Sequence, residues 1–530
     1  MAKPSLTTVA LDPSPFRAGL ALALAAALAT PSAAAVAPSL LRARLNADIL
    51  SSDPGTRRDE NTDAVLLHVV EGLVAVREDT SIGPLLASRW TVAPDGKTYV
   101  FQLRPGIVFH NGAPLTSADV VWSLNRYLDP KTRWRCLSDL SKGGLAEVTA
   151  VTAHGPLTVS ISLDRPAPLF LKTLARADCG GTGILQRASV DPHGAWVAPI
   201  GTGPFRFAAW KRNQYIELRR FDRYQARPGP PDGNTGGKTA AVDTVRFLVI
   251  PDGSAARAAL LRGELDVLDN LNPVELAALR GKSGVRIQSA PSDDLYALLL
   301  QTRDPLLRDP RFRRALAISL DTAALTRAIT RGEGRPDSGP VPSPSPFYGP
   351  VESAPIRPDL AQARRLLTAC GYRGQAIKLA TNQRYPLMFD SAVVIQAMAK
   401  QAGINFEIET LDWATQLARY AAGDYQAMTF GYSARLDPSL TFASLIGDKA
   451  KDPRKVWDTP AARRLLDRSM AEADPVRRQA VFDDLTRAWR QDTPSVVLFN
   501  SGRITALRST VSGYRSWPAQ QQRLWGVAVN

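Results

Sequence analysis

Histidine and cysteine are scarce in this 530-residue chain, which has four His and three Cys. The histidines lie far apart in the sequence, at His68, His110, His154 and His193. The chain also lacks a Gly-x-Ser-x-Gly nucleophile elbow, a His-x-x-x-His metal pair, a Cys-x-x-Cys pair and a Gly-x-x-x-x-Gly-Lys-Ser/Thr phosphate loop. Catalysis by His requires a partnered nucleophile or carboxylate, and the sequence indicates none. We therefore expect no enzyme activity, no resident metal and no cofactor.

Long apolar runs are absent after residue 35, and the one before it is short. The stretch "AGLALALAAALA" at 18–29 follows Lys3 and Arg17 and precedes an Ala-x-Ala site at Ala33 and Ala35. This order is typical of a secretory signal peptide, predicted here over residues 1–35 and removed by cleavage. No later stretch reaches the roughly 18 apolar residues that a membrane-spanning helix needs. We expect a secreted, periplasmic protein.

Blocks of like charge are missing as well, although the chain is basic. Its 65 Lys and Arg exceed its 50 Asp and Glu, which gives a formal charge of +15, but the positive residues are scattered and no aromatic platform interleaves with them. Nucleic-acid binding is therefore not expected. Of the basic residues 52 are Arg, a side chain suited to forked contacts with carboxylates, although a GC-rich genome would produce the same bias.

Residues 84–128 predict a strand, a turn, a second strand and a helix. Asp95-Gly96 is predicted to close the hairpin, and Thr116 with Asp119 forms a capping-box pattern at the start of the helix. The segment "FHNGAPLTSADVVWSLNR" at 109–126 holds several polar side chains, yet most have a task in a turn or a cap. His110 has no predicted catalytic partner, so we interpret this segment as structural.

The later part of the chain alternates helix and strand. A Pro/Gly-rich surface loop is predicted at 225–240, and a βαβ unit follows at 243–271. From residue 273 onward, helices that begin at Asp caps and end at Gly alternate with apolar strands. The pattern predicts an α/β fold.

Five segments resemble the family 5 extracellular solute-binding proteins, which are the dipeptide-, oligopeptide- and nickel-binding components of ABC importers. They are "LASRWTVAPDGKTYVFQLRPGIVFHNGAPLTSADVVWSLNR", "PIGTGPF", "LLRGELDVLD", "DPRFRRALAISLD" and "RRLLTACGY". Their order and spacing match the family over essentially the whole mature chain. The resemblance implies an α/β type 2 periplasmic binding protein with two α/β lobes, a hinge and an extra subdomain on lobe I.

The family layout assigns segments of the chain to each lobe. Lobe I is expected from 36–60, 196–272 and 499–530, its subdomain from 61–195, and lobe II from 273–498. The strands "LDVLDNL" and "SVVLFN" are then expected to be the two hinge crossings. Cys136 and Cys179 fall in the same subdomain, so they are the candidate disulfide pair in an oxidising compartment, and Cys370 is expected to be a small buried residue in a helix.

In the peptide binders of this family, an Asp after a Gly-aromatic pair in lobe II holds the α-ammonium group of the peptide. The matching stretch here is "FGYSARLDPSL", in which Tyr432 follows Gly431 and Arg435 stands where the acid would be. Asp437 is a possible displaced equivalent. An Arg435 that faces the cleft would favour a carboxylate or phosphate, whereas an Arg435 paired with Asp437 would be architectural.

Further ligand-binding candidates lie beside Arg435 and in two other parts of the sequence. They are Ser433, Trp134 with Arg133 or Arg135, and Trp413, for which core packing is the alternative. Nickel is disfavoured, because residues 273 onward contain no His.

The predicted function is capture of a peptide or similar small solute between two lobes and delivery to the permease of an ABC importer in the inner membrane. The solute could be anionic, and the protein is expected to be a monomer. Two alternatives stay open: a binder of a non-peptide anionic solute, and a peptide-binding chaperone or signalling receptor without transport.

Overall fold

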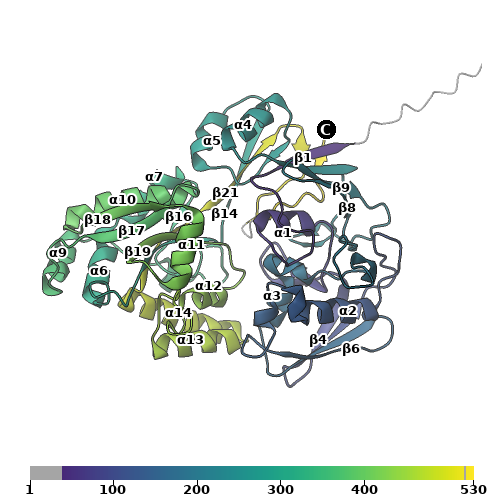
Figure 1. Ribbon diagram of the computed structural model, residues 1–530, viewed down its shortest axis with the longest axis horizontal. Coiled ribbons are helices and arrows are strands. Elements are labelled where there is room, and N and C mark those ends of the chain that lie inside the picture. Colours follow the sequence, from purple (N-terminus) through teal and green to yellow (C-terminus); the bar gives the residue numbers. More distant parts are fainter. Residues whose placement is uncertain (1–38, 518–520) are drawn as a thin grey trace, which may run out of the picture. The chain divides into compact units, whose positions relative to one another are not determined.

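The computed structural model describes residues 39–517 and 521–530, so the predicted signal peptide at 1–35 lies outside the described residues (Figure 1). None of the helices in the described part is both long and apolar enough to cross a bilayer. The elements are mixed α/β, as the sequence predicts, and the large majority of the strands belong to three sheets.

A seven-stranded sheet gathers strands from distant parts of the chain. Its order is β14 (Val285–Pro291), β21 (Gly502–Arg508), β13 (Val267–Leu268), β1 (Leu40–Leu45), β12 (Thr244–Val249), β9 (Tyr215–Arg220) and β8 (Phe205–Lys211). Strand β1 runs parallel to both β12 and β13, and the other pairings are antiparallel. Helices α4 (Gly253–Arg262) and α5 (Pro273–Leu279) lie beside it (Figure 1) and share a hydrophobic cluster with β13 and β21. The predicted βαβ unit at 243–271 is thus confirmed as β12, α4 and β13.

A six-stranded sheet forms the centre of the second α/β region. Its order is β16 (Arg335–Pro336), β20 (Ser495–Asn500), β15 (Leu295–Leu300), β19 (Ala427–Tyr432), β17 (Ile377–Asn382) and β18 (Phe406–Leu411). Side chains of β15 alternate between two hydrophobic clusters, with Leu298 and Leu300 in one and Ala297 and Leu299 in the other. Both faces of this sheet are therefore buried under helices.

Each face of the six-stranded sheet has its own set of helices. The first cluster is built with α6 (Pro310–Ser319), α7 (Thr322–Thr330), α9 (Leu360–Ala369) and α10 (Pro386–Ala402). The second is built with α11 (Trp413–Ala422), α12 (Pro438–Leu445), α13 (Pro460–Ala471) and α14 (Pro475–Asp492). The short helix α8 (Pro350–Ser353) contacts α14.

The third sheet confirms the hairpin predicted around Asp95-Gly96. It contains β4 (Ala87–Val92), β5 (Thr98–Leu103), β7 (Thr158–Leu163) and β6 (Val148–Ala153), in that order. Helix α2 (Ser117–Leu128) packs on it, and the Asp119 carboxylate accepts hydrogen bonds from the backbone N–H (2.9 Å) and hydroxyl (2.7 Å) of Thr116. His110 is held against the chain, with Nε2 3.0 Å from the carbonyl oxygen of Gly203. The helix cap predicted in the segment at 109–126 is thus confirmed.

Smaller elements complete the described part. The helices are α1 (Glu60–Leu66), α3 (Phe170–Ala175) and the 3₁₀ turns η1 (Pro130–Thr132), η2 (Leu137–Asp139), η3 (Ala177–Thr182) and η4 (Arg187–Ser189). The two-stranded ribbons are β2 (Val74–Val76) with β3 (Ile82–Pro84), β10 (Pro231–Asp232) with β11 (Thr235–Gly236), and β22 (Val511–Ser512) with β23 (Ala528–Val529).

Two short segments connect the seven-stranded and six-stranded sheets. One is residues 292–294, between β14 and β15, and the other is Ser501, between β20 and β21. They are hydrogen-bonded to each other, because Ser292 N donates to the Ser501 carbonyl at 3.0 Å and Ser501 N donates to Asp294 Oδ1 at 2.7 Å. The chain therefore crosses between the sheets at two adjacent points.

The first crossing differs from the expectation that "LDVLDNL" at 265–271 forms it. Strand β14 still belongs to the seven-stranded sheet, where it pairs with β21 from residue 285 to 291, although lobe II was expected to begin at 273. An alternating strand sequence shows which face is buried but not which strand lies beside it. The second expected crossing, at "SVVLFN", does adjoin Ser501.

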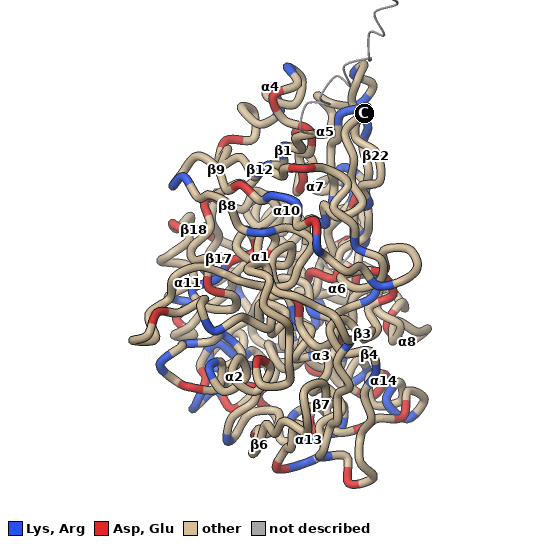
Figure 2. The backbone as a smooth tube through the Cα atoms, turned by 90° about the vertical axis from the view of Figure 1, so that its right-hand side faces the viewer, with Lys and Arg blue, Asp and Glu red and all other residues tan. Residues whose placement is uncertain are grey.

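The charges are dispersed over the described chain. Figure 2 shows Lys and Arg interspersed with Asp and Glu along the backbone. This agrees with the scattered charge of the sequence.

Candidate functional site

A cavity of about 130 Å³ lies between two regions that are distant in the sequence. The lining residues are Arg58, Glu60, Asp63, Val76, Arg135, Arg176, Ala177, Asp178, Asn234 and Gln521 on one side, and Ser433, Ala434, Arg435, Leu436 and Leu440 on the other. Pockets for drug-sized ligands typically measure about 300–1,000 Å³. In the conformation of this structure, the cavity has room for a small solute and not for a long peptide.

One wall of the cavity is the short connection at 433–436. It follows β19, and the helix α12 begins directly after its cap, Asp437. The Asp437 carboxylate accepts from Ser439 N at 3.0 Å, and Pro438 occupies the first helical position, where its missing N–H costs nothing. Leu436 packs against the hydrophobic cluster that contains β1, β5 and α2. The connection therefore reaches from the six-stranded region to the other side of the cavity.

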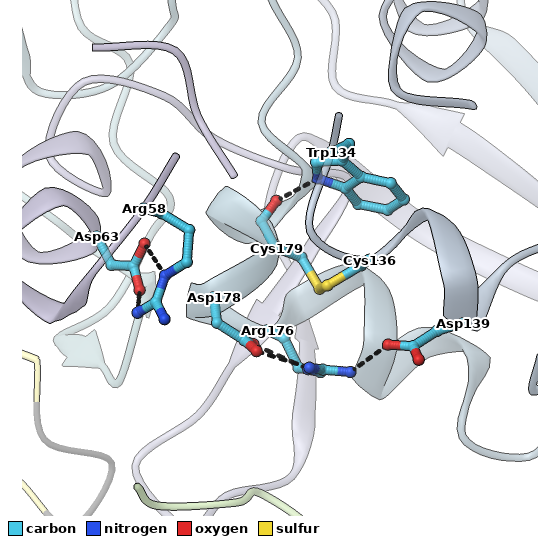
Figure 3. Close-up of a disulfide and its surroundings, with 8 residues drawn as sticks. All are labelled: Arg58, Asp63, Trp134, Cys136, Asp139, Arg176, Asp178 and Cys179. Carbon is cyan, nitrogen blue, oxygen red and sulfur yellow. Dashed lines mark hydrogen bonds and ion pairs between the residues drawn. A yellow bond between two sulfur atoms is a disulfide. The ribbon is translucent and has the colours of Figure 1, made fainter. Parts of the chain in front are cut away.

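The opposite wall is tied together by a disulfide between Cys136 and Cys179 (Figure 3). The predicted disulfide pair is thus confirmed. The indole N–H of Trp134 donates to the Cys179 carbonyl at 2.9 Å, and Arg135 N donates to the Gly55 carbonyl at 2.8 Å. The loop that carries Arg135 is thereby fixed beside Asp178.

A glycine is required next to this disulfide. Gly180 has φ +67°, and a Cβ there would lie 2.6 Å from the backbone N of Gly55. A side chain at position 180 would push apart the two backbone segments that form this wall.

The carboxylates that line the cavity are all held in ion pairs. Asp63 is paired with Arg58, and Arg176 binds Asp178 at 2.6 Å (Figure 3). Glu60 accepts from Arg503, which lies outside the cavity lining, at 2.7 Å. Burial raises the pKa of Asp63 to about 7, even though Arg58 opposes the shift. For Asp178, burial would raise the pKa, but Arg176, Arg435 and Arg135 hold it well below its usual value.

The guanidinium groups of Arg135 and Arg435, which also line the cavity, are not in ion pairs with carboxylates of the described chain. In the described part of the chain, neither Arg135 nor Arg435 forms an ion pair, and the side chain of Arg435 donates only to the carbonyls of Ser433 (3.1 Å) and Ala434 (3.2 Å). The pKa of Arg435 is lowered by burial, and Arg176, Arg135 and Arg58 lower it further, whereas Asp178 opposes the shift. The cavity is thus a place of excess positive charge.

Of the ligand-binding residues expected from the sequence, Arg435 and Ser433 line the cavity. Tyr432 does not: it is buried, and its hydroxyl lies 3.3 Å from that of Tyr420. The reason is the alternation of β19, which turns Tyr432 toward the hydrophobic cluster under the six-stranded sheet. Trp413 also packs there, stacked on Phe430, so core packing accounts for it.

Asp437 is fully buried and is not a partner of Arg435. Its carboxylate binds Arg478 through two contacts of 2.6 and 2.9 Å, and Lys172 at 2.8 Å. The architectural alternative for Arg435, a pair with Asp437, is therefore wrong. Asp437 itself is fully engaged in capping and ion pairing.

The three candidate residues of the 133–135 loop lie in different environments. Trp134 is buried against Tyr127. Arg133 and Arg135 are both exposed, and Arg133 lies outside the cavity lining. Arg135 is the residue that lines the cavity. Arg133 adopts a left-handed conformation, with φ 55°.

Sequence reasoning missed Asn234, which lies in the loop at 225–240 that was expected to cover only surface. Its side chain is 6% exposed, lines the cavity, and leaves Oδ1 without a hydrogen-bond partner. The sequence "DGNTGG" around Asn234 predicts a β-hairpin. Such a pattern does not show against which part of the protein the tip of the hairpin packs.

A group of Cys136, Asp178 and Cys179 has atoms close enough to suggest a metal site. The two sulfur atoms are bonded to each other, however, and a metal would need them as thiolates. This group is therefore structural.

Comparison with known proteins shows which family the chain resembles. The family model of the bacterial extracellular solute-binding proteins, family 5 Middle, matches residues 81–453. The dipeptide-binding protein of Escherichia coli (strain K12) is 26% identical over 504 residues, which cover 90% of this chain and 91% of that protein. The probable di/tripeptide-binding protein 5 of Pseudomonas aeruginosa (strain UCBPP-PA14) is 26% identical over 534 residues, with 95% and 97% covered.

A solved structure shows the same fold. The ABC transporter-associated periplasmic binding protein DppA from Helicobacter pylori, in complex with the peptide STSA, superposes with a TM-score of 0.78 and 24% identity, and covers 92% of this chain and 98% of its own. The fold is that of a type 2 periplasmic binding protein. Because the family model matches well over half of its residues, the chain belongs to the bacterial extracellular solute-binding proteins of family 5.

Proposed function

We propose that this protein captures a peptide or similar small solute in the cavity lined by 58–63, 176–178 and 433–436, and delivers it unaltered to the permease of an ABC importer. One observation carries the proposal: the cavity walls come from two regions that are built around separate sheets and joined by two adjacent crossings. A solute that contacts both walls stabilises the closed arrangement of the two regions.

The two regions correspond to the lobes. In this proposal lobe I contains the seven-stranded and four-stranded sheets, lobe II contains the six-stranded sheet, and the bend occurs at 292–294 and at Ser501. The names of the relatives, which bind dipeptides or di- and tripeptides, favour a peptide as solute. The proposal also includes a monomer in the periplasm, exported by a cleavable signal peptide.

Native mass spectrometry of the protein purified from its own host tests this function. We expect a complex whose excess mass belongs to one small solute, and fragmentation identifies that solute as a peptide or peptide-like compound. Protein that is stripped by unfolding and refolding should rebind it with a dissociation constant in the range of about 1 μM or tighter. If neither a retained solute nor rebinding of any host metabolite is seen, the proposal is wrong.

Transport is tested separately from binding. Uptake of the labelled solute should stop when either this protein or its permease is deleted from the host. If uptake is unchanged in both deletions while binding is retained, the protein is a receptor or chaperone without a role in import.

A further inference from the structure

We infer that the solute carries a net negative charge, with a carboxylate held by Arg435 and Arg135 and an N–H group that donates to Asn234. This inference rests on the proposed function and specifies the chemistry of its solute. The nearest class is an acidic peptide, or a peptide-like acid with more carboxylates than ammonium groups.

The first argument is the distribution of committed and uncommitted charges. Each carboxylate of the cavity already has a guanidinium partner, so an ammonium group entering the cavity would find no free anion. Arg435 and Arg135, from opposite walls, form no ion pair in the described chain, although both act electrostatically on Asp178, which Arg176 already binds. A carboxylate between them would form charge-assisted hydrogen bonds with both and so join the two walls.

The second argument is the unpartnered carboxamide of Asn234. Buried polar groups are nearly always hydrogen-bonded, and those that are not require an explanation. Asn234 is 6% exposed, lines the same cavity and leaves Oδ1 without a partner. The oxygen of a carboxamide accepts hydrogen bonds, so Oδ1 of Asn234 calls for an N–H donor on the solute, such as the N–H of a peptide bond.

The position of Asn234 is fixed by the backbone of the hairpin β10–β11. Asn234 N donates to the Val76 carbonyl at 2.8 Å. The preceding Gly233 has φ +61°, and a Cβ there would lie 2.3 Å from the same carbonyl oxygen. Because the hairpin tip is docked this closely, the backbone of Asn234 is fixed in the cavity wall before any solute arrives.

Calorimetric titration with two dipeptides of nearly equal shape, Ala-Glu and Ala-Gln, tests the inference. Wild-type protein should bind Ala-Glu at least about tenfold more tightly than Ala-Gln, because the extra carboxylate meets unpaired guanidinium groups. The Arg435→Gln variant should reduce this preference to about twofold or less, mainly by loss of Ala-Glu binding. Arg135→Gln should reduce it in the same direction, and Arg435→Lys should keep part of it.

Two further variants separate charge from structure. Arg133→Gln removes an exposed arginine of the same loop that does not line the cavity, and should leave both affinities unchanged. Asn234→Asp places a negative charge in the wall and should weaken Ala-Glu more than Ala-Gln, whereas Asn234→Leu lacks this charge and should not discriminate as strongly. Thermal melting shows that each variant is folded.

Three results would overturn the inference. They are equal wild-type affinities for the two dipeptides, an Arg435→Gln effect that is the same for both, and no binding of Ala-Glu by a protein that still retains a host solute. The last result leaves capture itself intact, so failure of the acidic assignment is distinguishable from failure of the proposed function.

Discussion

The ammonium group of Lys172 lies 2.8 Å from Oδ2 of Asp437, although the two residues belong to different hydrophobic units. Lys172 is in α3, whose Phe170 and Leu174 are part of the cluster with β1 and α2. Asp437 caps α12, whose Phe442 is part of a cluster under the six-stranded sheet. Lys172 also donates to the Leu436 carbonyl at 3.3 Å. This contact therefore joins the two regions directly beside the cavity.

Replacing Lys172 by Met should weaken solute binding without unfolding the protein. A hydrogen-bonded charge contact that is largely buried contributes about 1–2 kcal/mol, so the affinity for the retained solute should fall roughly five- to thirtyfold. The melting temperature should change little, because Asp437 keeps its two contacts with Arg478. Calorimetric titration and thermal melting measure the two quantities.

Lys142→Met is the matched control, because Lys142 is exposed and forms no ion pair within the described residues. It should leave the affinity unchanged. An affinity of Lys172→Met equal to that of wild type would show that this contact does not contribute to closure.

Removal of the disulfide should affect both stability and binding. Cys136 and Cys179 are 43 residues apart, and closing a loop of this length stabilises the folded state by about 4 kcal/mol in the chain-entropy description. The double variant Cys136→Ala/Cys179→Ala should lose up to that amount in denaturant unfolding. It should also bind more weakly, because Arg135 and Asp178 are adjacent to the bond.

The matched control is Cys370→Ala, which removes the free cysteine of the described chain. Its stability and its affinity should stay close to those of wild type. If reduction of wild-type protein changes neither quantity, the disulfide does not hold the cavity wall.

Asp337 should make the protein less stable as the pH rises. Its side chain is buried, and burial raises its pKa to about 8, although Arg335 and Arg490 oppose the shift. Between about pH 4 and pH 8 the folded state keeps a proton that the unfolded state releases, so the free energy of unfolding falls as the pH rises through this window. Asp63 and Asp293, each with a pKa raised to about 7 by burial, act in the same direction.

The Asp337→Asn variant isolates this contribution. Its Oδ1 can still accept from Ser338 N, as Asp337 Oδ1 does at 2.7 Å, but it has no proton to lose. Between about pH 5 and about pH 8, urea unfolding should show the variant gaining roughly 3–4 kcal/mol of stability relative to wild type. Parallel pH curves for the two proteins would contradict the raised pKa.

Local signals in the sequence were sufficient for most individual elements. The Asp95-Gly96 hairpin and the Thr116–Asp119 cap depend on residues that are close in the chain, so short patterns predict them correctly. The candidacy of Arg435 came instead from the family resemblance of the stretch after Gly431, and local patterns left open whether its side chain faces the cavity.

Contacts between distant segments could not be predicted in the same way. The pairing of β14 with β21 joins residues more than 200 positions apart, and alternation in either strand does not identify its partner. The position of Asn234 in the cavity wall and the Lys172–Asp437 contact could not be predicted for the same reason, because both depend on where one element packs against a distant one.

Small-angle X-ray scattering of the stripped protein, with and without the solute recovered from it, tests the central claim most directly. We expect a smaller radius of gyration after loading, as the two regions close on the solute, and recovery of the solute at its original mass. Superimposable scattering profiles, or a solute that is consumed during incubation, would contradict capture of an unaltered solute between two regions.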